Sequence, residues 1–246
     1  MSRWIDAFLD MLVAERGASK NTCIAYDRDL KDYTAYLNSQ GLTPQTVGPE
    51  EISAYLSALA RAGAKPTTAA RKLSALRQFH RFLYGEGYAP RDATATVDAP
   101  RKGRPLPKFL SEAEVDTLLT AARKTKGLDG VRLVCLLEVL YATGLRVSEL
   151  VTLPLSAARR EEPFLMVRGK GGKERLVPLS PPARQALVAY RKVRDAFLPD
   201  GVKDSPYLFP SRSKEGYLTR QRFGQMLKEL SLQAGLDPAK ISPHVL

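Results

Sequence analysis

The chain has 246 residues, enough for one large domain or two ordinary ones with hydrophobic cores of their own. Hydrophobic residues make up 44% of the chain and charged residues 26%, which is close to globular averages and excludes wholesale disorder. The 38 Lys and Arg outnumber the 26 Asp and Glu, and the resulting net charge of +12 favours a polyanionic partner.

Several classes of protein are excluded by what the sequence lacks. Cys23 and Cys135 are far apart, and with only His80 and His244 they cannot form a Cys/His zinc site or a disulfide scaffold. No apolar run approaches the roughly 18 residues of a membrane span, and Asp6 interrupts any signal peptide. We therefore expect a soluble, cytoplasmic protein with no membrane partner and no bound metal.

Residues 1–88 are predicted to form a bundle of four helices. Apolar residues recur every three or four positions in four segments, and the loops between them are short. Ser19 is typical of a helix N-cap, Pro49 of a first helical position, and Thr67 is predicted to begin the fourth helix. The four stripes are Ile5, Phe8, Leu9 and Leu12; Tyr26, Leu30, Tyr33 and Leu37; Ile52, Tyr55, Leu56 and Leu59; and Leu73, Leu76, His80 and Leu83. His80 is therefore interpreted as a core residue or one that faces the polyanion.

The segment 89–107 is interpreted as a linker between domains, because it combines four prolines with several basic residues. We expect it to lack packing partners and to lie along the polyanion. Arg101, Lys102 and Arg104 are its candidate contacts.

Residues 108–246 are predicted to form a second domain of helices with a small β-hairpin, so the fold class is mainly α. Ser111 to Glu114 forms a capping box, and the apolar run 131–140 is typical of a buried helix that stops at Gly144. A short helix follows over 146–150. Strand-like runs at 164–167 and 175–177 flank a Gly-Gly turn, and further helices are predicted from Pro181 to about Phe197 and from Thr219 to about Ala234.

Two segments of this domain carry residues suited to phosphate chemistry. Arg146 follows the break at Gly144, where rigid backbone could aim its guanidinium at a phosphate. The alternative, favoured by spacing alone, is an ion pair with Glu149 on a surface helix. In the hairpin, Lys170 and Lys173 could neutralise a phosphate or deliver a proton, or could belong to a solvated turn. The hairpin lacks the Ser or Thr of a nucleotide-binding P-loop.

Three motifs, in order, resemble those of the tyrosine recombinases (phage integrases) of the Xer group: YATGLRVSELVTL, RGKGGKERLVPLS and SPHVL. The segments that open each domain are more similar to the XerD branch of that group than to the XerC branch. The resemblance implies a SAM-like, core-binding N-terminal domain and a mixed α/β catalytic domain that together clamp duplex DNA. By motif position it implies catalytic roles for Arg146, Lys170 and His244, and we expect Lys173 and Arg175 to add DNA contacts in the hairpin.

The resemblance also implies a reaction and partners. A tyrosine would attack the scissile phosphate and form a 3′-phosphotyrosine, with no cofactor, and the protein would resolve chromosome dimers at dif-type sites. The implied partners are a XerC-like recombinase in a heterotetramer and an FtsK-like translocase. The alternative is a non-catalytic DNA-binding protein that uses the same clamp. A plain RNA-binding protein has no aromatic RNP-like motif in its favour.

The sequence departs from the family at its end. The second catalytic Arg of the family follows the HVL triplet directly, and this sequence stops at Leu246. We therefore expect a truncated form of a recombinase, in which the full-length protein is an enzyme and the 246-residue chain binds DNA without cleaving it.

Overall fold

The computed structural model describes residues 2–100, 109–158, 162–169 and 172–242. The chain divides into two compact units, Met1–Pro105 and Leu106–Leu246, and each has its own hydrophobic core. The mainly helical fold class with a small β-hairpin is confirmed.

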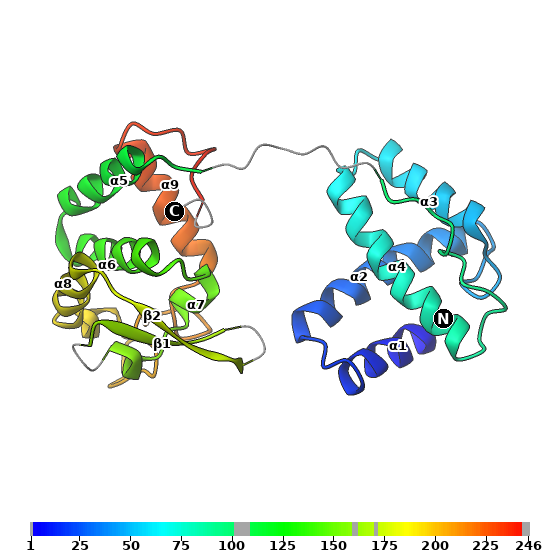
Figure 1. Ribbon diagram of the computed structural model, residues 1–246, viewed down its shortest axis with the longest axis horizontal. Helices are drawn as coiled ribbons and strands as arrows, with labels where there is room; N and C mark the ends of the chain where they lie inside the picture. Colours follow the sequence, from blue (N-terminus) through cyan, green and yellow to red (C-terminus); the bar gives the residue numbers. More distant parts are fainter. Residues whose placement is uncertain (1, 101–108, 159–161, 170–171, 243–246) are drawn as a thin grey trace. The chain divides into compact units, whose positions relative to one another are not determined.

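The first unit contains four α-helices: α1 (Ser2–Ala14), α2 (Lys20–Ser39), α3 (Pro49–Arg61) and α4 (Pro66–Gly85). The long helix α4 contacts each of the other three, as Figure 1 shows. The helix starts follow local chemistry: the Ser19 hydroxyl accepts a hydrogen bond from the Thr22 amide at 3.2 Å, and Pro49 occupies the first turn of α3. Helix α4 begins one residue before the predicted Thr67, because Pro66 already fits the first turn of a helix.

The apolar stripes of these helices meet in one core. The predicted residues Phe8, Leu30, Tyr33 and Leu37 are buried there, and so is His80 on α4. The Tyr33 hydroxyl lies 2.9 Å from Nε2 of His80, and burial lowers the pKa of this histidine to about 4. His80 is thus a neutral core residue, which decides between the two interpretations left open by its spacing.

The segment that follows α4 differs from the expectation of a linker without packing partners. Ala89, Ala93 and Val97 are buried in the core of the first unit. The Arg77 guanidinium donates a hydrogen bond of 2.7 Å to the Val97 carbonyl, which ties the segment to α4. Small apolar residues between the prolines allow this packing, so the segment up to residue 97 is part of the first unit.

The second unit contains five α-helices and one hairpin in its described residues: α5 (Glu112–Lys124), α6 (Gly127–Thr143), α7 (Val147–Val151), α8 (Pro181–Arg191), α9 (Arg220–Gln233), and strands β1 (Phe164–Arg168) and β2 (Glu174–Pro178). Short 3₁₀ helices lie at Leu155–Ala158 and Arg194–Phe197. Helix α6 is central: it contacts α5, α7, α8 and β2 (Figure 1). Its buried face supplies Leu133, Leu136, Val139 and Leu140 to the core.

Local signals place most of these elements. Ser111 and Glu114 form the predicted capping box, with the Ser111 amide 2.8 Å from the Glu114 carboxylate. The helix predicted from Pro181 to Phe197 ends earlier, at Arg191. The buried Arg194 donates hydrogen bonds of 2.7 Å to the carbonyls of Ser205 and Tyr207, and this long-range anchoring favours a 3₁₀ turn over a continued helix.

The two strands form an antiparallel hairpin in which Met166 pairs with Leu176 and Arg168 with Glu174. Leu165, Val167 and Val177 face the core, and the alternate residues face solvent. The hairpin therefore rests on the core through one face, which fixes its register.

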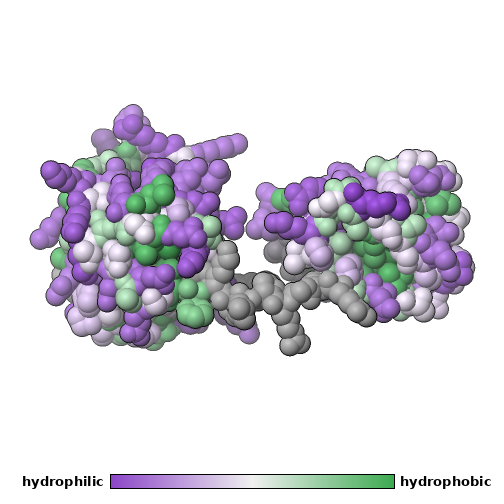
Figure 2. All heavy atoms as spheres, turned by 90° about the horizontal axis from the view of Figure 1, so that it is seen from above, coloured by the Kyte–Doolittle hydropathy of each residue, from purple (hydrophilic) through white to green (hydrophobic). Residues whose placement is uncertain are grey.

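The surface of both units is mostly hydrophilic in the view of Figure 2, with small apolar areas between polar residues. Helices in the described part of the chain are too short or too polar to cross a membrane.

Candidate active site

The site around Arg146 begins where helix α6 stops. Gly144 adopts a left-handed conformation, with φ of 58°, and its amide closes the helix on the Leu140 carbonyl at 2.9 Å. Glycine takes this conformation without the steric cost of a Cβ atom. Leu145 is buried, and Arg146 is then the residue that caps α7. Buried neighbours on both sides fix the backbone from which this arginine projects.

Glu149, in the first turn of α7, collects hydrogen bonds from two arginines. The backbone amide of Arg146 donates to Oε2 at 2.9 Å, and its Nη1 donates to Oε1 at 3.1 Å. The Arg175 guanidinium, on β2, donates from Nη1 to Oε1 at 3.2 Å and from Nη2 to Oε2 at 2.8 Å. One carboxylate thus joins α7 to the hairpin, and Arg175 holds it in a bidentate fork.

The electrostatics of Glu149 follow from these contacts. Its side chain is only 7% exposed, which by itself would disfavour the charged form. Hydrogen bonds from Arg175 above all, and then from Arg146, outweigh burial and lower the pKa of Glu149 to about 2. The carboxylate is therefore ionised at neutral pH.

The hairpin approaches this cluster through a glycine. The Gly169 amide donates to the Lys173 carbonyl at 2.8 Å, and a Cβ atom at Gly169 would lie 2.7 Å from Nη1 of Arg175. Any other residue would displace that guanidinium, so this glycine permits a close approach of backbone and side chain. Lys173 is exposed nearby.

Arg146 makes the ion pair that its spacing favours and is also placed to bind a phosphate. The ion pair with Glu149 is present, yet the Arg146 side chain is 64% exposed. Its Nε and Nη2 have no hydrogen-bond partner within the described part of the chain. The arginine is therefore held at one end of its guanidinium while the other end faces solvent, as binding of an anion requires.

Most of the other residues predicted to act in catalysis or DNA binding cannot be placed in this site. Lys170, His244, Arg101, Lys102 and Arg104 lie outside the described residues, so their roles stay predictions. The sequence predicts a DNA contact for Arg175, and its pairing with Glu149 is seen only in the structure. A signal was present in the acidic residue three positions after Arg146, but it gave no indication of a partner 26 residues further along the chain.

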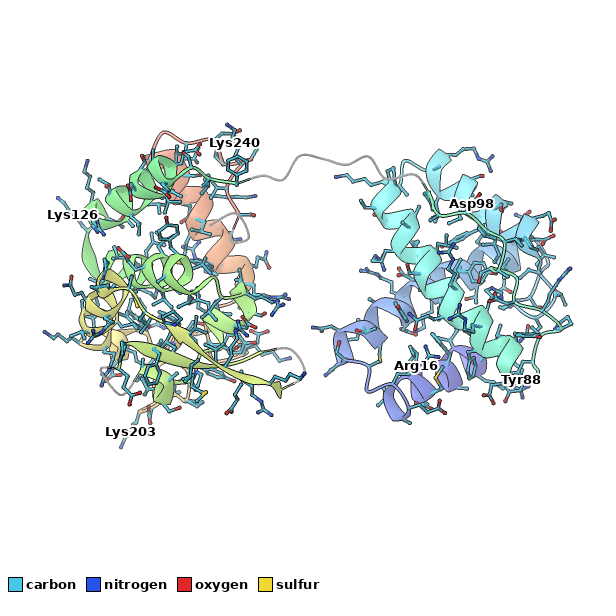
Figure 3. All side chains as sticks on the ribbon, viewed as in Figure 1. Arg16, Tyr88, Asp98, Lys126, Lys203 and Lys240 are labelled. Carbon is cyan, nitrogen blue, oxygen red and sulfur yellow. The ribbon has the colours of Figure 1, made fainter. Side chains whose placement is uncertain are left out.

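Other basic side chains point away from the second unit. Figure 3 shows Lys126, Lys203 and Lys240 projecting outward from three different loops, and all three are exposed. Within the described ranges, no three His, Cys, Asp or Glu side chains gather closely enough to hold a metal ion.

Comparison with protein families gives matches to both units. Residues 5–87 match the phage integrase N-terminal SAM-like domain, and residues 108–246 match the phage integrase family. Among curated relatives, the tyrosine recombinase XerD of Caulobacter vibrioides is 50% identical over 243 residues, which are 99% of this chain and 80% of the relative. XerD of Rhizobium meliloti is 48% identical over an alignment that includes 99% of this chain and 79% of the relative.

Solved structures share the fold. A XerH recombinase bound to a palindromic difH substrate has a TM-score of 0.74 at 20% identity, covering 94% of this chain and 67% of its own. A lambda integrase dimer bound to a COC′ core site has a TM-score of 0.70 at 20% identity, covering 96% of this chain and 82% of its own. The XerD relatives agree with the branch indicated by the sequence motifs.

Proposed function

The chain belongs to the phage integrase family, and from its likeness to XerD recombinases we propose that it is the DNA-binding and catalytic part of a site-specific tyrosine recombinase. The observation that carries this proposal is Arg146: a family-motif arginine whose guanidinium is anchored on one side and exposed on the other. A non-catalytic DNA-binding protein with the same clamp is the alternative.

The chemistry assigned to Arg146 is stabilisation of the reacting phosphate. When a tyrosine hydroxyl attacks a phosphodiester, negative charge accumulates on the non-bridging oxygens. A guanidinium held at a fixed position can donate two hydrogen bonds to these oxygens. The Glu149 carboxylate and the rigid start of α7 would keep the guanidinium in place before the DNA arrives, so that little reorganisation is needed.

The other roles rest on the motif resemblance. Lys170, in the hairpin, would protonate the leaving 5′-oxygen, and His244 would share in stabilising the phosphate. Arg101, Lys102, Arg104 and Lys173 would contact the DNA backbone. These assignments require no metal or other cofactor.

We further propose the domain roles and the biological setting. The first unit, with residues 89–97 packed on its core, would be the core-binding domain, and residues 108–246 would be the catalytic domain. The recombinase would act in the cytoplasm on dif-type sites and resolve chromosome dimers. It would work with a XerC-like recombinase in a heterotetramer, and with an FtsK-like translocase.

The first experiment measures binding by the 246-residue chain as a function of salt. The probe is a duplex selected from a random library with this chain. Counterion release predicts that affinity falls steeply, by about a thousandfold or more between low and moderate salt if six or more phosphates are contacted. An affinity that does not change with salt would contradict the clamp.

The second experiment separates the recombinase from the non-catalytic alternative. Residues 1–246 are joined to the C-terminal segment of a XerD relative, which carries the family's nucleophilic tyrosine. We call this fusion protein the extended recombinase. On a nicked duplex, it should form a covalent protein–DNA adduct on a denaturing gel. Residues 1–246 alone should form none, because the family places the nucleophile after His244. An adduct with the 246-residue chain would show that one of its own tyrosines reacts.

Arg146→Ala in the extended recombinase tests the site itself. We expect DNA affinity to change little and the rate of adduct formation to fall by about a hundredfold or more, because the lost contact is strongest in the transition state. Adduct formation at the wild-type rate would refute the assignment.

A further inference from the structure

Arg175 is the candidate for a new role in this site. It lies on β2, where its charge alone favours a DNA contact. Both terminal nitrogens of its guanidinium are instead engaged by Glu149, at 3.2 and 2.8 Å. A guanidinium engaged in a bidentate fork has only its outer donors left for a second partner.

The same carboxylate holds Arg146. Its Oε1 accepts from Nη1 of both arginines, and its Oε2 accepts from Nη2 of Arg175 and from the Arg146 backbone amide. Glu149 cannot rotate toward either arginine without loss of a bond to the other. The orientation of Arg146 therefore depends on a residue that does not touch it directly.

The charge balance supports this dependence. A pair of Arg146 and Glu149 alone is neutral and would attract an anion weakly. With Arg175 the cluster carries one net positive charge, and that charge is exposed mainly at Arg146, whose side chain is 64% exposed compared with 42% for Arg175.

We propose that Arg175 is a positioning residue: it fixes the Glu149 carboxylate in a bidentate fork and thereby aims the Arg146 guanidinium at the DNA phosphate. This inference rests on the proposed function. It adds a functional residue to Arg146, Lys170 and His244, the three positions that the resemblance assigns to catalysis. It also explains Gly169, since a side chain there would collide with Nη1 of Arg175.

The rival explanation is that Arg175 itself binds a DNA phosphate. Lysine distinguishes the two, because it binds phosphate as a point charge but cannot make the planar fork to a carboxylate. Arg175→Lys keeps the net charge and should preserve a direct phosphate contact. If Arg175 acts by positioning, the same substitution should reduce function.

The test is a double-mutant cycle in which every protein has the same net charge. Arg146→Lys, Arg175→Lys and the double variant are compared with wild type in the extended recombinase, by the single-turnover rate of adduct formation on a nicked duplex. The same four forms of the 246-residue chain are compared by affinity for the selected duplex.

We expect Arg175→Lys to reduce the rate by about tenfold, the worth of one charged hydrogen bond. In the Arg146→Lys background, it should change the rate by less than about twofold. The proposal is overturned if Arg175→Lys behaves like wild type, or if its effect is the same with and without Arg146.

Thermal unfolding of the four proteins separates positioning from stability. A purely structural role for Arg175 predicts a lower unfolding temperature and an equal loss of rate in both Arg146 backgrounds, and this result also overturns the proposal. If the wild-type extended recombinase forms no adduct, the proposed function fails. The order of the Arg146 guanidinium in the 246-residue chain, measured by ¹⁵N NMR, then still decides the proposal: Arg175→Lys should increase its mobility, and unchanged mobility would overturn the positioning role.

Discussion

Replacing Glu149 by glutamine tests the electrostatic centre of the site, because it removes the charge and keeps the shape. The carboxylate accepts four hydrogen bonds from two arginines and has a pKa lowered from 4.5 to about 2. A shift of that size corresponds to at most about 3–4 kcal/mol of folding free energy. Because the arginine side chains are 64% and 42% exposed, solvent screening reduces the expected loss in Glu149→Gln to roughly 1–2 kcal/mol.

The pH dependence of this loss has a defined sign. The pKa of Glu149 is lower in the folded than in the unfolded chain, so the stabilisation is present in full above about pH 5. It declines as the pH falls from 4.5 toward 2, where the carboxylate becomes protonated in both states. At pH 3, less than half of the pH 7 difference between wild type and Glu149→Gln should remain.

Urea unfolding followed by circular dichroism at several values between pH 7 and pH 3 measures this difference. Glu174→Gln, at an exposed carboxyl group on β2, is the matched control and should change stability by less than about 0.5 kcal/mol at pH 7. Equal stability of Glu149→Gln and wild type at pH 7 would refute the reasoning. A difference that stays constant down to pH 3 would also refute it.

Two further predictions concern the architecture. Limited trypsin digestion should cut within residues 101–108 before it cuts at Arg91. The reason is that the segment up to Val97, which includes Arg91, is packed on the first unit. First cleavage at Arg91 would contradict that packing. Gly130→Ala should destabilise the second unit by about 2–3 kcal/mol in a urea titration, because its Cβ would lie 2.0 Å from the Thr125 carbonyl oxygen. Gly85→Ala, which meets nothing within 4 Å, should be neutral or stabilising by up to about 1 kcal/mol, and an equal loss in both variants would show that the close contact is not the cause.

The helices and the hairpin could be predicted because their signals are local. The 3.6-residue spacing of apolar residues, the cap at Ser19, the capping box at Ser111 and the left-handed glycine after α6 each depend on a few neighbouring residues. The three motifs that contain Arg146, Lys170 and His244 likewise indicated the family, since each is a contiguous string of residues.

What only the tertiary structure decided are the pairings between distant segments. Residues 89–97 have the composition of a linker, yet Ala89, Ala93 and Val97 are buried in the core of the first unit. Helix α8 stops early because Arg194 bonds to carbonyls more than ten residues away. Arg175 has the charge of a DNA contact, but the fold brings it to Glu149, 26 residues earlier. Sequence spacing encodes the period of an element, whereas the partner of a long side chain depends on how the elements pack, and the role of a charged residue depends on that partner.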